Sequence, residues 1–96
     1  MSRMINILGV MYDVNGVEVV DKANPKKGEI NYLTNEIRID NSLNQSAFNQ
    51  TLMHEILHAI FDLIGWDDMA ENEEKVQCLA TALHQVFTAQ TIFPSS

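Results

Sequence analysis

The sequence predicts a single α+β domain in which a small three-stranded sheet packs on two helices. Alternating β-branched and aromatic residues, punctuated by Asn15-Gly16 and Thr34-Asn35, fill the first half of the chain. Apolar residues at helical spacing fill the second half, in two segments separated by Gly65. The chain has 96 residues, of which 46% are hydrophobic, and this suits one globular domain over residues 1–96.

The strands are expected within the first 40 residues. The segment MINILGVMYDV is typical of extended structure, and a turn is expected after it at Asn15-Gly16. The segments GEINYL and EIRID should form a hairpin around Thr34-Asn35. Ile37 and Ile39 should then face the core, because side chains alternate between the two faces of a strand.

Two helices are expected after the strands. Asn44 or Ser42 can cap the first helix, which should run to Gly65. The second should start near Ala70, with acidic residues in its first turn that complement the helix dipole. Its apolar residues recur at helical spacing and predict a buried stripe of Val76, Leu79, Ala80, Leu83, Val86 and Phe87.

The charge balance argues against a nucleic-acid-binding protein. Six basic residues against 13 acidic ones give a net charge of −7, whereas nucleic-acid binders usually carry a basic surface. An acidic domain is better suited to a cationic partner, including a metal ion. No stretch approaches ~18 consecutive apolar residues, so no membrane partner is expected. Cys78 is the sole cysteine, which excludes an intrachain disulfide and fits a cytoplasmic location.

The segment TLMHEILHAIF contains the motif HExxH on a predicted helix. His54 and His58 lie ~40° apart around that helix, one turn above the other, so both imidazoles can reach one ion. The apolar residues of the helix lie on the opposite side. Two unrelated surface histidines are the simpler interpretation, but the complete motif in its helical context favours a metal site.

The chemistry explains the residue types. Neutral imidazoles bind Zn²⁺ well, and two ligands on one rigid helix have little orientational freedom left to lose. Glu55 is poorly placed as a ligand but can lie beside a zinc-activated water, whose pKa the metal lowers to about 7. The sequence therefore predicts peptide-bond hydrolysis with Glu55 as general base.

A third protein ligand is needed, and position 64, where an extended motif would carry a histidine, is Ile. The acidic start of the second helix is the expected source. Glu73 lies closest to the predicted buried stripe, whereas Glu74 points nearly opposite; we therefore expect Glu73, with Glu74 as the alternative and Glu71 less favoured.

Other polar residues carry weaker hypotheses. Asp62 is a possible acceptor for a ligand imidazole, although solvation of the helix end is the simpler role. Tyr32 is a possible donor to a developing oxyanion, although a half-buried strand tyrosine is the simpler account. His84 is expected at the surface or boundary of the second helix.

The segments GEINYLTNEIRID, TLMHEILHAIF and NEEKVQCLATALHQVF together resemble small HExxH proteins of bacteriophages and prophages, which are similar to reduced ImmA/IrrE zinc peptidases of the gluzincin type. The resemblance implies a minimal zincin core, with His54, His58 and Glu73 as Zn²⁺ ligands and Glu55 as general base. It also implies a strand such as EIRID beside the cleft, able to pair with an extended substrate. The expected partner is a protein or peptide, such as a bacterial or phage regulator, in the bacterial cytoplasm. Gln77 departs from similar sequences, which often carry an acid there.

A zinc-dependent metallopeptidase is thus the leading hypothesis. The alternative is a non-catalytic, zinc-stabilised module that binds a protein or peptide, in which Glu55 is dispensable. A zinc ribonuclease is disfavoured, because its third histidine would fall at Ile64 and the net charge opposes RNA binding.

Overall fold

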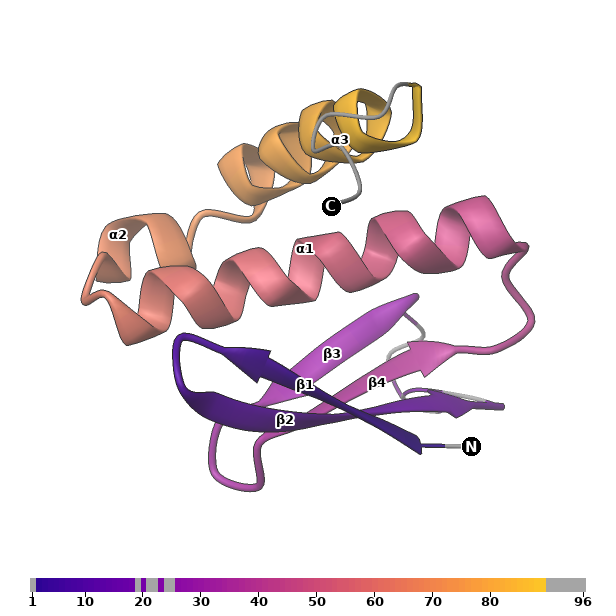
Figure 1. The fold of residues 1–96 in the computed structure, drawn as a ribbon, viewed down its shortest axis with the longest axis horizontal. Helices are drawn as coiled ribbons and strands as arrows, with labels where there is room; N and C mark the ends of the chain where they lie inside the picture. Colours follow the sequence, from indigo (N-terminus) through magenta and orange to yellow (C-terminus); the bar gives the residue numbers. More distant parts are fainter. Residues whose placement is uncertain (1, 19, 21–22, 24–25, 90–96) are drawn as a thin grey trace, which may run out of the picture.

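The computed structural model describes residues 2–18, 20, 23 and 26–89. Over these residues the elements are, in chain order, β1 (Ser2–Ile7), β2 (Val10–Val17), β3 (Gly28–Asn31), β4 (Glu36–Asp40), α1 (Gln45–Leu63), α2 (Asp67–Ala70) and α3 (Glu73–Ala89). Figure 1 shows α1 lying between the sheet on one side and α3 on the other. The fold is α+β, as predicted.

The sheet has the strand order β1-β2-β4-β3, so the prediction of three strands is wrong for the described part of the chain. The difference arises at Leu8-Gly9, where the chain turns and divides the predicted first strand into β1 and β2. Both turn residues have positive φ, 52° and 90°, as the commonest two-residue hairpin turn requires. Asn6 supports the turn by accepting a hydrogen bond from the backbone N–H of Gly9 at 2.7 Å.

The turn predicted at Asn15-Gly16 is also wrong, because both residues lie inside β2. They pair with Arg38 and Ile39 in a parallel register between β2 and β4. A side chain at position 16 would press on Asn41, since an added Cβ would lie 3.2 Å from the Asn41 Cβ. Glycine at position 16 therefore allows β2 to approach the residue that follows β4 closely.

The predicted hairpin at Thr34-Asn35 is confirmed: β3 and β4 pair antiparallel on either side of it. Asn35 has a φ of 54°, a conformation that asparagine adopts more readily than most residues. Ile37 and Ile39 are fully buried, as predicted, and pack with Tyr12, Val14, Leu52 and Ala59 between the sheet and α1.

Helix α1 begins as predicted. The Asn44 side chain accepts a hydrogen bond from the backbone N–H of Ala47 at 2.9 Å, which satisfies one of the free donors of the first turn. The helix ends at Leu63, and Gly65 follows with a φ of 81°, a conformation that favours glycine.

The second long helix, α3, begins at Glu73 rather than near Ala70. Asn72 sets this start, since its side chain accepts a hydrogen bond from the backbone N–H of Lys75 at 2.9 Å. The short helix α2, which the sequence analysis did not predict, fills residues 67–70.

The buried face of α3 is narrower than the apolar stripe predicted from the sequence. Val76 and Ala80 are fully buried against Leu57 and Phe61 of α1 in a second core cluster. Leu79 and Phe87 were expected in this stripe but are 38% and 48% exposed. Among the described elements α3 packs on α1 and α2, so its buried face is narrow.

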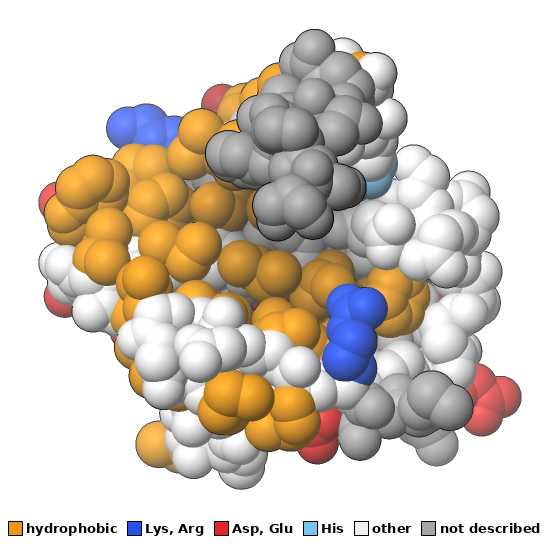
Figure 2. Space-filling model, in the orientation of Figure 1, with side chains coloured by type: hydrophobic (Ala, Val, Ile, Leu, Met, Phe, Trp, Pro, Cys, Tyr) orange, Lys and Arg blue, Asp and Glu red, His pale blue; other side chains and the backbone are white. Residues whose placement is uncertain are grey.

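Hydrophobic side chains also gather on the surface. Figure 2 shows them over the side of the molecule where α2 and the end of α1 lie in Figure 1. The exposed residues of this region include Leu63, Ile64 and Trp66. Among the described residues, no helix combines the length and apolar character needed to cross a bilayer.

Candidate metal centre and cleft

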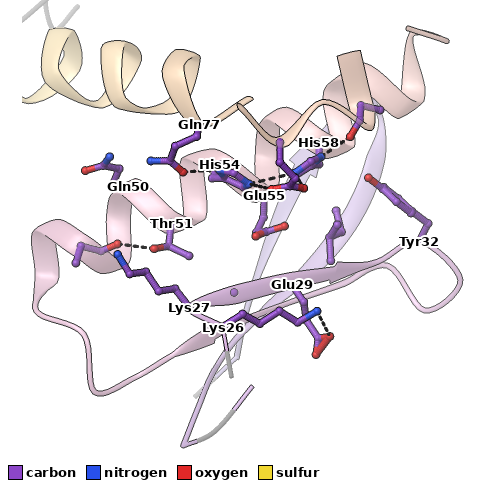
Figure 3. Close-up of a pocket in the computed structure, with 15 residues that line it drawn as sticks. Lys26, Lys27, Glu29, Tyr32, Gln50, Thr51, His54, Glu55, His58 and Gln77 are labelled. Carbon is purple, nitrogen blue, oxygen red and sulfur yellow. Dashed lines mark hydrogen bonds and ion pairs between the residues drawn. The ribbon is translucent and has the colours of Figure 1, made fainter. Parts of the chain in front are cut away.

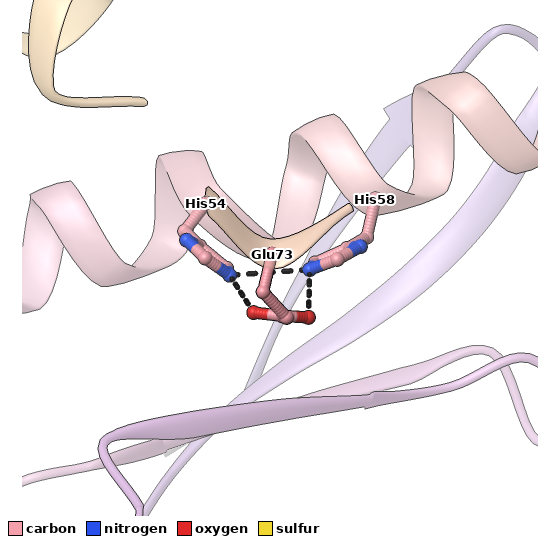
Figure 4. A group of neighbouring side chains, drawn as sticks. All are labelled: His54, His58 and Glu73. Carbon is pink, nitrogen blue, oxygen red and sulfur yellow. Dashed lines mark hydrogen bonds and ion pairs between the residues drawn. The ribbon is translucent and has the colours of Figure 1, made fainter. Parts of the chain in front are cut away.

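Two imidazoles and one carboxylate converge between α1 and the start of α3. Figure 4 shows His54 and His58 projecting from successive turns of α1 toward Glu73. The His58 Nε2 lies 2.8 Å from Glu73 Oε1, the His54 Nε2 lies 3.0 Å from Glu73 Oε2, and the two Nε2 atoms are 3.1 Å apart. This is the arrangement that the helical spacing of the motif predicts.

The other nitrogen of each ring is held by a hydrogen bond. The His58 Nδ1 lies 2.7 Å from the backbone carbonyl oxygen of Ala70. A carbonyl oxygen can only accept, so Nδ1 carries the proton and donates it. The His54 Nδ1 likewise faces the side-chain oxygen of Gln77 at 2.8 Å. Gln77 is oriented in turn by Thr81, whose hydroxyl oxygen lies 3.2 Å from the Gln77 Nε2.

These contacts fix the tautomer of each imidazole. A neutral ring that donates from Nδ1 has a lone pair on Nε2, and both Nε2 atoms face each other and the Glu73 carboxylate. Lone pairs that meet at such distances repel unless a cation, either a proton or a metal ion, lies among them. Two imidazole nitrogens and a carboxylate oxygen also form a donor set found in catalytic zinc sites. The residues present therefore fit a zinc ion.

Glu73 reaches the histidines because α3 docks on α1. Asn72 sets the first turn of α3, and Val76 packs one turn beyond Glu73 against Leu57. Among the described residues, Glu73 is the acidic residue that groups with His54 and His58. Glu71 and Glu74, the alternatives from the sequence, are exposed and lie outside this group.

Glu55 is buried beside the centre. Its side chain is 6% exposed, and burial raises its carboxyl pKa to about 7, against an opposing effect of His54 and with a further rise from Glu73. Such a carboxyl can accept and release a proton near neutral pH. The close approach of β3 accounts for the burial, since a Cβ added at Gly28 would lie 3.3 Å from Glu55 Oε2 and 2.7 Å from Thr51 Cγ2.

The centre lies in an open cleft with a volume of about 660 Å³, which β3, α1, the end of α2 and the first turns of α3 line. Figure 3 shows β3 along one side of this cleft and the histidines along the other. The expectation that EIRID borders the cleft is wrong, because these residues form β4, an inner strand between β2 and β3. The outer strand β3 takes that place, in the sequence GEIN.

Several contributing residues were missed or misjudged from the sequence. The acceptors for the ligand imidazoles are Gln77 and the Ala70 carbonyl, whereas the candidate Asp62 is exposed at the end of α1. Spacing gave a partial signal for Gln77, which lies one turn beyond Glu73 on the same face of α3. Nothing local in the sequence singles out Ala70. Tyr32 lines the cleft, and His84 lies partly buried on α3 away from it.

Comparison of the chain with protein-family models, with curated proteins and with solved structures finds no match.

Proposed function

We propose that this protein is a zinc-dependent metallopeptidase in which His54, His58 and Glu73 bind the metal and Glu55 is the general base. The observation that carries the proposal is the pair of Nε2 atoms, each with its tautomer set by a hydrogen bond at Nδ1, that face one carboxylate. Such hydrogen bonds are typical of histidines that bind metals in proteins. The resemblance to reduced ImmA/IrrE peptidases with a zincin core supports the same assignment.

Bound zinc, Glu55 and the edge of β3 would have different roles in hydrolysis. Bound zinc would supply a Lewis acid and would acidify a water molecule. Glu55 takes a proton from the attacking water and delivers it to the amine nitrogen as the C–N bond breaks. Its pKa of about 7 suits both transfers near neutral pH. Among the described strands β3 is an outer one, and its edge that no described strand pairs with is available to hydrogen-bond an extended peptide across the cleft.

The proposed substrate is a protein or peptide. The cleft is open, and a strand edge at its wall favours an extended chain rather than a compact small molecule. The sequence resemblance suggests a bacterial or phage regulator as the natural substrate and the bacterial cytoplasm as the place of action. A phage or prophage origin is part of the same proposal.

Metal analysis tests the centre. Purified protein should carry about one zinc ion per chain, and His54→Ala and Glu73→Gln should each lose most of it. Glu74→Gln is the matched control for Glu73→Gln, because it removes a neighbouring carboxylate outside the group. Zinc retained in Glu73→Gln but lost in Glu74→Gln would overturn the ligand assignment.

Proteolysis tests the reaction. The zinc-loaded protein should cleave members of a randomised peptide library, detected by mass spectrometry, and Glu55→Gln should keep its zinc but cleave nothing. Cleavage by Glu55→Gln at the rate of the unaltered protein would exclude Glu55 as the base.

A second candidate function is a zinc-stabilised module that binds peptides without cleaving them. The observation that favours it is the edge of β3 that no described strand pairs with. That function predicts equal peptide retention by both proteins and no cleavage by either.

A further inference from the structure

The turn between β3 and β4 carries Tyr32 at the cleft on an anchored backbone. The Asn31 side chain accepts hydrogen bonds from the backbone N–H groups of Leu33 at 2.9 Å and Thr34 at 3.2 Å. The carbonyl oxygen of Asn35 also accepts a hydrogen bond from the backbone N–H of Asp13 at 2.9 Å, which ties the turn to β2. The backbone that carries Tyr32 is therefore bound at both ends of the turn.

The Tyr32 side chain points into the cleft, unlike that of its neighbour. Figure 3 shows the ring extending from the turn with its hydroxyl toward the side where His58 lies. The residue lines the cleft together with His54, His58, Glu55 and Glu73. Leu33, the next residue, is 97% exposed. Within the described residues, the Tyr32 hydroxyl makes no hydrogen bond, so its donor is free for a ligand.

The surroundings of Tyr32 keep its proton in place. Partial burial raises the pKa of its hydroxyl to about 12, with further contributions from Asp62, Tyr12, Glu55 and Glu73. The hydroxyl is consequently a neutral donor throughout the neutral pH range. Among the described residues that line the cleft, Tyr32 therefore offers a neutral hydrogen-bond donor on the wall that faces α1.

We propose that the Tyr32 hydroxyl donates a hydrogen bond to the carbonyl oxygen of the scissile peptide bond as negative charge develops on it. This inference rests on the proposed peptidase function. When water adds to the carbonyl carbon, an electron pair of the C=O bond moves to the oxygen, and Tyr32 stabilises that charge without giving up its proton. The anchored backbone of the turn favours this role, because a donor already placed near the developing charge costs little reorganisation during the reaction.

The test is Tyr32→Phe, which removes the hydroxyl and keeps the ring. Leu33→Ala is the matched control, since it truncates a side chain in the same turn that points away from the cleft. Both variants should retain zinc. On a fluorogenic peptide chosen from the library, Tyr32→Phe should lower kcat by about 100-fold or more, the cost typical of losing one such donor. KM should change little, because the interaction forms chiefly in the transition state. A kcat within threefold of the unaltered protein would refute the role.

A binding measurement separates this inference from the proposed function. If the zinc-loaded protein cleaves no peptide, the peptidase proposal fails. The role of Tyr32 is then tested by measuring the binding of a dipeptide phosphonamidate, whose tetrahedral anionic group resembles the transition state. Tyr32→Phe should weaken binding of this probe at least about tenfold more than binding of the parent dipeptide. Equal weakening of both ligands, or none, would show that the hydroxyl does not recognise the developing charge.

Discussion

Replacing Glu55 by Gln should stabilise the metal-free protein at about pH 8 and leave its stability at about pH 4 nearly unchanged. Burial raises the pKa of the Glu55 carboxyl from 4.5 to about 7, although His54 opposes the rise. The folded state therefore binds this proton more tightly than the unfolded state. As the pH rises from about 4.5 through about 7, the folded state must ionise a buried carboxyl and loses stability.

The size of this effect follows from the pKa. Each pH unit of difference between folded and unfolded pKa values corresponds to about 1.4 kcal/mol. A rise of about 2.5 thus costs the folded protein about 3 kcal/mol once the pH exceeds about 7. The amide of Gln has the shape of the protonated carboxyl and cannot ionise, so Glu55→Gln escapes this cost. At about pH 4 the Glu55 carboxyl is mostly protonated in both the folded and the unfolded state, so the two proteins should be similar in stability.

Urea unfolding followed by circular dichroism, in the presence of a chelator, measures the difference. Glu71→Gln is the control, because this exposed carboxylate should contribute within about 0.5 kcal/mol at either pH. Added zinc should shrink the gain of Glu55→Gln, since the ion attracts the ionised carboxylate. A variant that is equally stable relative to the unaltered protein at both pH values, or less stable at the higher one, would refute the account of Glu55.

Three further predictions concern the walls of the cleft. Gly28→Ala should destabilise the fold by about 1–3 kcal/mol, because its Cβ would lie 2.7 Å from Thr51 Cγ2. Thr51→Ser removes that methyl group and should restore much of the loss in thermal unfolding of the double variant; no recovery would point to another cause. Gln77→Ala should weaken zinc binding about 10- to 100-fold in competition with a chelating dye, because His54 loses its acceptor, and an unchanged affinity would contradict this role. Asn31→Ala should lower the free energy of unfolding by about 1 kcal/mol, because two backbone N–H groups lose their acceptor; an unchanged urea midpoint would argue against it.

The parts of the fold that local chemistry determines were predicted well. Asn44 caps α1 because its side-chain oxygen reaches a free backbone donor three residues ahead. Ile37 and Ile39 are buried because strand alternation puts them on one face. The pairing of His54 with His58 follows from the pitch of a helix. None of these needs knowledge of a distant segment.

The wrong predictions concern features of the fold that depend on contacts between segments distant in the sequence. Asn15-Gly16 is a strong local signal for a hairpin, yet backbone pairing with β4 keeps both residues extended. The chain turns at Leu8-Gly9 instead, and an additional strand results. The strand beside the cleft was misassigned for the same reason, because strand order within a sheet depends on pairings that the sequence does not display.

In the candidate site, too, the features set by local spacing were predicted and those set by contacts between helices were not. The helical wheel of the second helix favoured Glu73 over Glu74, and Glu73 is the acid that lies at the histidines. The roles of Gln77 and the Ala70 carbonyl depend on how α2 and α3 dock on α1, which no spacing within a single helix reveals. The ligand roles themselves stay predictions until metal is measured.

Among the described residues outside α1, those that hydrogen-bond the two histidine side chains all lie in a stretch of eight residues, from Ala70 to Gln77. The HExxH motif alone therefore does not orient its histidines; it needs this short stretch packed against α1. Loss-of-function substitutions should accordingly cluster at Val76 and Ala80, which anchor it on α1, as well as at the motif. A molecule that displaced this stretch from α1 would be expected to abolish metal binding without contacting either imidazole.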